Sequence, residues 1–81
     1  MDTPPFEPDA VLIHREGTAH RPGCFHNDDR LIRSGEHGGW GWVSGIPAER
    51  WLRISPSHPL KAAEGDTSRL ATKRCAHCPD R

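Results

Sequence analysis

The hydrophobic residues of this chain fall in short runs separated by turn-forming residues, a pattern typical of short β-strands rather than long helices. The longest apolar run opens segment 10–14, which is partly β-branched and predicts a first strand. Segments 30–34 and 40–44 predict two paired strands, because the glycine-rich stretch 35–39 between them has the length of a hairpin connection. Residues 15–29 are rich in turn formers and are predicted to be irregular. A central β-hairpin is therefore the expected framework.

The second half of the chain predicts short helical turns. Pro47 is suited to the first position of a helix and Pro56 would end it, although residues 51–54 fit a strand equally well. Two further helical turns are expected at residues 59–64 and 66–74. Together with the hairpin, these elements predict a small α+β fold.

The apolar content limits what the core can contribute to stability. Leu, Ile, Val and Phe together number 13 of 81 residues. A core of this size rarely supplies more than about 3–5 kcal/mol, so an additional cross-link is expected. Residues 1–9, with three prolines and three acids, predict a flexible N-terminal lead-in. Residues 10–81 are then expected to form one small domain.

Charge and composition argue against several classes of protein. Eleven basic and eleven acidic residues give a net charge of zero, unlike a strongly basic nucleic-acid coat. No apolar run is long enough for a transmembrane helix, and no secretory signal is visible, so no membrane partner is expected. Three cysteines fit a disulfide framework poorly, which favours a cytoplasmic location with reduced thiols. No frame of catalytic residues is recognisable, so neither an enzyme nor a small-molecule substrate is expected.

The cysteines point to a metal site. Cys75 and Cys78 have two residues between them, the spacing of a zinc knuckle. The remaining cysteine, Cys24, follows His20 across a Pro-Gly turn, which would let both side chains converge on one point. These four residues predict a Cys₃His site for a structural Zn²⁺ ion. Metal binding would then supply much of the folding free energy that the small core lacks.

The identity of the fourth ligand stays open at the level of sequence. His20 is preferred, His26 is the alternative, and His77 is a further option. Three thiolates make a zinc ion a poor Lewis acid and leave no open position once a histidine binds, so a structural rather than a catalytic ion is expected. A zinc-stapled domain of this kind resembles zinc-ribbon and zinc-knuckle architectures in general terms.

Tryptophan and arginine residues provide a candidate surface for partners. Trp40 and Trp42 share one face of the predicted strand, either as core residues or as an exposed platform. Gly41 between them predicts a bulge or the close approach of another backbone. Tryptophan and arginine are both enriched at protein interfaces. The candidate partner-binding residues are Trp40, Trp42, Arg30, Arg33 and Arg53.

These features together predict a non-enzymatic, zinc-stabilised binding module. The expected role is that of a regulator or accessory protein that docks on a protein partner, such as a nucleic-acid-handling machine. Direct binding of DNA or RNA by a zinc protein is one alternative. A structural or assembly subunit of a larger complex or virion is another.

Overall fold

Strand β1, Val11–Ile13, is the middle strand of a five-stranded sheet, and all three of its side chains are buried. It pairs antiparallel with β2, Thr18–His20, on one side and with β3, Gly41–Val43, on the other. The strand predicted at residues 10–14 is thus confirmed. The computed structural model describes residues 6–24 and 28–76, to which all structural statements below refer.

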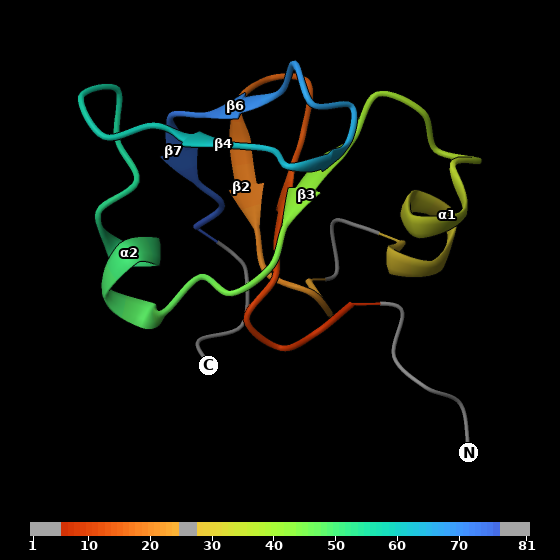
Figure 1. Cartoon of the computed structure of the whole chain (residues 1–81), viewed down its shortest axis with the longest axis horizontal. Coiled ribbons are helices and arrows are strands. Elements are labelled where there is room, and N and C mark those ends of the chain that lie inside the picture. The colour runs from red at the N-terminus through yellow and green to blue at the C-terminus, as the bar shows by residue number, and fades with distance from the viewer. Residues whose placement is uncertain (1–5, 25–27, 77–81) are drawn as a thin grey trace.

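The sheet is completed by two short edge strands from the C-terminal half of the chain. Strand β5, Glu64–Gly65, pairs antiparallel with β3, and β7, Lys73–Arg74, pairs parallel with β2. The resulting order is β5-β3-β1-β2-β7, a mixed sheet (Figure 1). Strands β4, Leu60–Lys61, and β6, Leu70–Ala71, form a separate two-stranded sheet. The parallel pairing of β7 with β2 carries the chain toward residue 75 along the edge of β2.

The predicted hairpin of segments 30–34 and 40–44 is wrong in its first strand. Residues Asp29–Ser34 form helix α1, whose first turn is capped by the Asp28 side chain accepting a hydrogen bond from the Leu31 backbone N–H. The helix ends at Gly35, whose φ of 89° places it in the left-handed region. These local capping signals outweigh the strand-forming residues between them. A central hairpin does exist, but it is made by β1 and β2, and β2 lies in a stretch that the sequence predicts to be irregular.

In the second half of the chain, the predicted helix near Pro47 is found, whereas the two predicted helical turns are wrong. Helix α2, Ala48–Leu52, begins directly after Pro47, as expected. The helical turns predicted at residues 59–64 and 66–74 are instead the strands β4 to β7. β5 pairs with β3, β7 pairs with β2, and β4 and β6 pair with each other. Such tertiary pairing routinely overrides local propensity.

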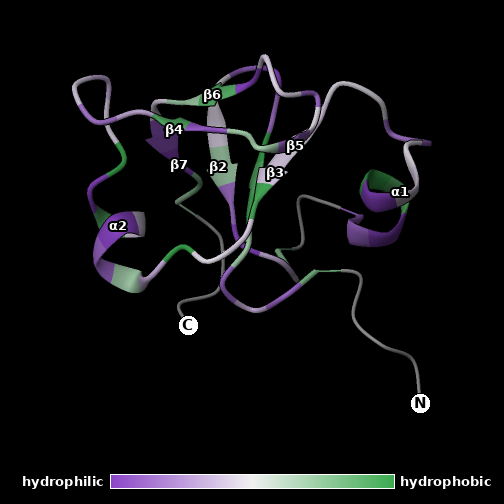
Figure 2. Ribbon diagram, viewed as in Figure 1, coloured by the Kyte–Doolittle hydropathy of each residue, from purple (hydrophilic) through white to green (hydrophobic). Residues whose placement is uncertain are grey.

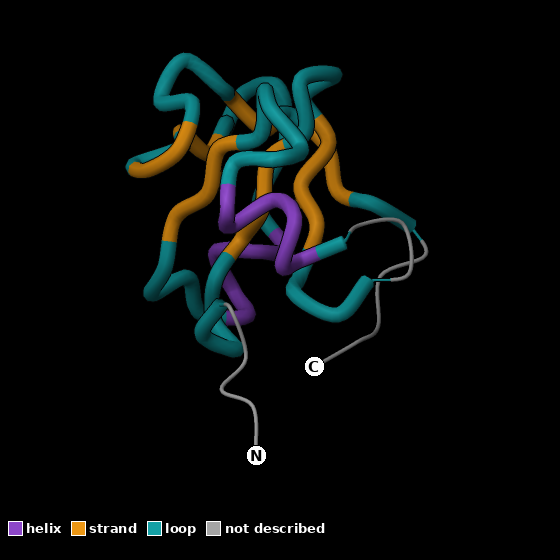
Figure 3. Tube along the Cα trace, turned by 90° about the vertical axis from the view of Figure 1, so that its right-hand side faces the viewer, coloured by secondary structure: helices purple, strands orange, loops and turns teal. Residues whose placement is uncertain are grey.

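Alternate residues of β1 point to two separate hydrophobic clusters, one on each face of the sheet. On one face, Val11 and Ile13 pack with residues of β2, of the two-stranded sheet and of the segments before and after α2. On the other face, Leu12 packs with Phe6, Trp42 and Ile32 of α1. The strongest hydrophobic colours accordingly run along the middle of the sheet (Figure 2). The two helices lie at opposite sides of the sheet in Figure 1 and overlap when the view is turned by 90° (Figure 3).

Arg21 anchors the segment that follows β2. Its guanidinium donates hydrogen bonds to the carbonyl oxygens of Ala10 and Ile46, at 3.2 and 3.1 Å. The same group lies 4.8 Å from the centre of the Trp51 ring, and the residue is 7% exposed. Arg21 thus ties the chain after β2 to the start of β1 and to the segment before α2.

Replacing Arg21 with methionine should lower the free energy of unfolding by about 3 kcal/mol, because two carbonyl oxygens lose a charged donor. Arg21→Lys should recover only part of this loss, since one ammonium group cannot reproduce a forked guanidinium. Urea denaturation measures both values. The matched control is Arg15→Met on the exposed turn between β1 and β2, where a change within about 0.5 kcal/mol is expected. Equal effects at positions 15 and 21 would contradict the anchoring role.

Candidate metal centre

Cys24 lies at the end of a tight turn that leaves β2. The backbone N–H of Cys24 donates to the carbonyl of Arg21, and Gly23 in this turn has a φ of 85°. The Gly23 N–H also donates to the Asp29 carboxylate at 2.7 Å, which ties the turn to the first residue of α1. The Cys24 side chain is 1% exposed. The turn therefore holds this sulfur inside the protein at a fixed place beside β2.

Cys75 reaches the same place from the far end of the chain. It directly follows β7, whose residue Arg74 is in register with Ala19 of β2. The Cys75 backbone N–H continues this pairing with a 2.8 Å hydrogen bond to the Ala19 carbonyl. Its sulfur lies 3.9 Å from that of Cys24, although 51 residues separate the two in sequence. The parallel strand pair thus brings the two cysteines together.

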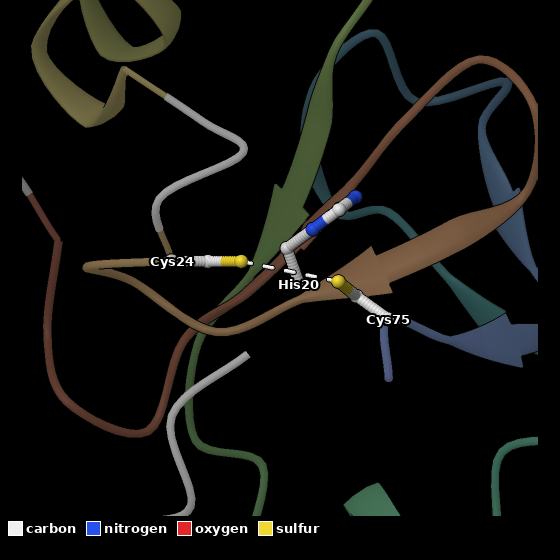
Figure 4. Close-up of side chains that lie close together, drawn as sticks. All are labelled: His20, Cys24 and Cys75. Carbon is white, nitrogen blue, oxygen red and sulfur yellow. Dashed lines mark hydrogen bonds between the residues drawn. The ribbon is translucent and has the colours of Figure 1, made fainter. Parts of the chain in front are cut away.

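His20 completes the group. It is the last residue of β2 and is buried, and its ring is tilted against that of Trp40 at 5.4 Å between ring centres. One ring nitrogen of His20 and the sulfurs of Cys24 and Cys75 all lie within 4.8 Å of one another. The two sulfurs point toward each other, and the imidazole ring stands beside the line that joins them (Figure 4). Three side chains of types that can ligate a metal ion, His20, Cys24 and Cys75, therefore converge on one small volume and are called the metal group below.

The distance between the sulfurs distinguishes two kinds of chemistry. A disulfide requires about 2.05 Å between its sulfur atoms. Two thiolates that each lie about 2.3 Å from a tetrahedral ion are separated by about 3.8 Å. The observed 3.9 Å excludes a disulfide, and it fits both two thiolates on one ion and two thiols in S–H···S contact. This His–Cys–Cys group could hold a metal ion with little movement of either sulfur.

Three of the predicted metal ligands are thus brought together, namely Cys24, Cys75 and His20. Cys78 and the alternative histidines, His26 and His77, lie outside the described residues.

The predicted partner-binding residues are distributed over the molecule. Trp42 is 9% exposed and packs edge-on against Phe6, so it belongs to the core. Trp40 is partly buried beside the metal group. The arginines are exposed, but Arg30 and Arg33 lie on α1 whereas Arg53 ends α2 on the other side of the sheet (Figure 1). The structure does not combine these five residues into one surface.

A pocket of about 310 Å³ adjoins the metal group and was not predicted. It is lined by two members of the group, two residues of the β1–β2 connection, one residue of β2 and the residue before β3, namely His20, Cys75, His14, Glu16, Thr18 and Trp40. The His14 ring packs edge-on against Trp40, with 4.9 Å between ring centres, and its Nδ1 lies 3.6 Å from the Glu16 carboxylate. These residues come from separate parts of the sequence, and the pairing of β1 with β2 and β3 and of β2 with β7 brings them to one pocket.

Comparisons with known proteins give no family assignment. No protein-family model, no curated protein and no solved structure matches this chain. In the described part of the chain, neither helix has the length and apolarity required to cross a bilayer.

Proposed function

We propose that this chain is a non-enzymatic binding module whose fold is completed by a structural Zn²⁺ ion. The proposed ligands are Cys24, Cys75, Cys78 and His20. The observation that carries the proposal is the convergence of three ligand atoms, from two distant parts of the sequence, within 4.8 Å of one another. Cys78 follows Cys75 at knuckle spacing, which supports its role as the fourth ligand.

Zinc is the favoured ion because of the donor types. Thiolates are soft ligands, and a combination of thiolates with an imidazole in tetrahedral geometry is typical of structural zinc. With three thiolates and one imidazole the coordination shell is closed, which argues against catalysis at the ion. A zinc ion at this position would cross-link the end of β2 and the turn after it to the segment that follows β7.

The proposed partner is a protein with an acidic surface, in a reducing cytoplasmic setting. Arg30 and Arg33 are exposed on α1, and the Arg33 guanidinium lies 5.7 Å from the Phe6 ring centre and 5.6 Å from that of Trp42. Packing against two rings limits the freedom of Arg33, which lowers the entropy cost of contact with a carboxylate. Because Trp42 is buried, it is left out of the proposed surface.

Metal content tests the proposal directly. Protein purified without added metal should contain one zinc per chain by mass spectrometry. A strong chelator should remove the ion and the folded signal together in circular dichroism, because the binding free energy of structural zinc is folding free energy. A chain that is fully folded without any metal would refute the structural-zinc proposal.

A further inference from the structure

The two sulfurs of the metal group differ in their access to solvent. Cys24 is almost completely buried, whereas Cys75 is partly exposed. Cys75 also lines two pockets, of about 310 and 400 Å³, on which Cys24 does not border. A small reagent that enters either pocket therefore meets Cys75 before Cys24. The sulfur of Cys24 lies 3.9 Å behind it.

From this arrangement, we propose that Cys75 is a site of oxidation by peroxides and that Cys24 is its resolving partner. The product is an internal disulfide between residues 24 and 75. Reactive cysteines that form disulfides in this way are accessible and lie close to a second cysteine, and this pair meets both conditions. Release of zinc by this oxidation rests on the proposed function, whereas the pairing of the two sulfurs does not.

The chemistry proceeds in two balanced steps. The Cys75 thiolate attacks one oxygen of hydrogen peroxide, so that an S–O bond forms, the O–O bond breaks and hydroxide leaves. This step oxidises the sulfur by two electrons to a sulfenic acid and reduces the peroxide. The Cys24 thiolate then attacks the Cys75 sulfur, so that the S–S bond forms, the S–O bond breaks and a second hydroxide leaves. Both hydroxides take up protons from solvent to give water.

Closing the disulfide requires a modest movement. The sulfurs must approach from 3.9 Å to about 2.05 Å. Cys75 follows a strand of only two residues at the edge of the sheet, so its end of the pair can shift without disturbing β1 or β3. Disulfide formation uses both thiolates, which leaves the ion with two of its four proposed ligands. Oxidation would therefore convert a metal cross-link into a covalent one between the same two segments.

Which two cysteines form the disulfide depends on whether the chain is folded. In an unfolded chain, ring closure favours the short loop from Cys75 to Cys78 over the long one from Cys24 to Cys75. Only a folded chain that holds residues 24 and 75 together should give the long-range product. The pairing is thus a measurable consequence of the structure.

The experiment treats the protein as purified with hydrogen peroxide and maps disulfides by mass spectrometry after differential alkylation. The expected main product in native buffer is the 24–75 disulfide, and in denaturing guanidinium the 75–78 disulfide. In a Cys78→Ser variant, where the shorter loop cannot form, the 24–75 disulfide should form at least about tenfold faster in native buffer than in denaturant. A Cys24→Ser/Cys78→Ser double variant should instead accumulate sulfinic acid at position 75, because no second cysteine remains to resolve the sulfenic acid.

Two kinds of oxidation product would overturn the proposal. One is a 75–78 disulfide as the main native product, and the other is over-oxidised Cys75 with Cys24 still reduced in the wild-type chain. Zinc is followed in the same samples with a colorimetric chelator. A chain that forms the 24–75 disulfide but never contained zinc refutes the zinc proposal alone. A chain whose zinc and thiols both survive peroxide refutes the oxidation proposal alone.

Discussion

Replacing Cys24 with alanine should abolish binding of the proposed zinc ion and lower the free energy of unfolding by more than about 3 kcal/mol, because the binding free energy of a structural metal is folding free energy. The loss exceeds that of a buried thiol alone, because Cys24 contributes both to the interior and to the metal group. Zinc titration separates the two contributions. Added zinc should raise the melting temperature of the metal-stripped wild-type chain and leave that of Cys24→Ala unchanged.

A pair of histidine variants provides the matched control. His20→Gln should weaken zinc binding by at least about tenfold, since an amide is a poorer ligand than imidazole for this ion. His58→Gln should leave zinc affinity unchanged, because His58 is exposed on a turn and contacts Ser57 rather than the metal group. Competition with a chromogenic chelator measures both affinities. If His20→Gln binds zinc with the affinity of the wild-type chain, His20 is not a ligand and another histidine must be the fourth ligand.

Replacing Gly41 with alanine should strongly destabilise the fold. A Cβ atom at this position would lie 2.5 Å from both the Ala62 Cβ and the Asp66 carbonyl oxygen. Neither atom is the end of a flexible side chain, so β3 and the segment 62–66 would have to move apart. We expect a loss of roughly 1–3 kcal/mol or more, measured by urea denaturation, as for other overpacked sites.

Gly38 is the natural control for Gly41. It lies in the same glycine-rich stretch, but a Cβ there would meet nothing within 4 Å. Gly38→Ala should therefore change the free energy of unfolding by less than about 0.5 kcal/mol. If Gly38→Ala and Gly41→Ala have equal effects, close packing is not the reason for glycine at position 41.

The close approach at Gly41 is one feature that the sequence predicted correctly. A glycine between two tryptophans in a strand predicts either a bulge or the close approach of another backbone. The second is found, because a Cβ at position 41 would lie 2.5 Å from the Asp66 carbonyl oxygen. The strand at residues 10–14 and the helix after Pro47 were also predictable, because an apolar β-branched run and a proline act through local preferences.

The errors have a common cause. Residues 30–34 were expected to pair as a strand, whereas Asp28 and Gly35 cap them as a helix. Segments 59–64 and 66–74 are predicted to be helical, whereas pairing of β5 with β3, of β7 with β2, and of β4 with β6 makes them strands. Helix α1 has six residues and strands β4 to β7 have two each, so they are too short to be identified from the periodicity of hydrophobic residues. Contacts at a distance, or capping at the ends, then decide the conformation.

By itself, the sequence determined which ligands are available: three cysteines, and a histidine that a Pro-Gly turn separates from Cys24. It also determined that the hydrophobic core is too small to stabilise the fold without a cross-link. The convergence of His20, Cys24 and Cys75, by contrast, depends on the tertiary structure. Their approach results from the parallel pairing of β7 with β2, a contact across more than fifty residues that no local pattern encodes. The same pairing leaves Cys75 accessible and Cys24 buried. Residue types set which chemistry is available, and the packing of the sheet decides which atoms can carry it out.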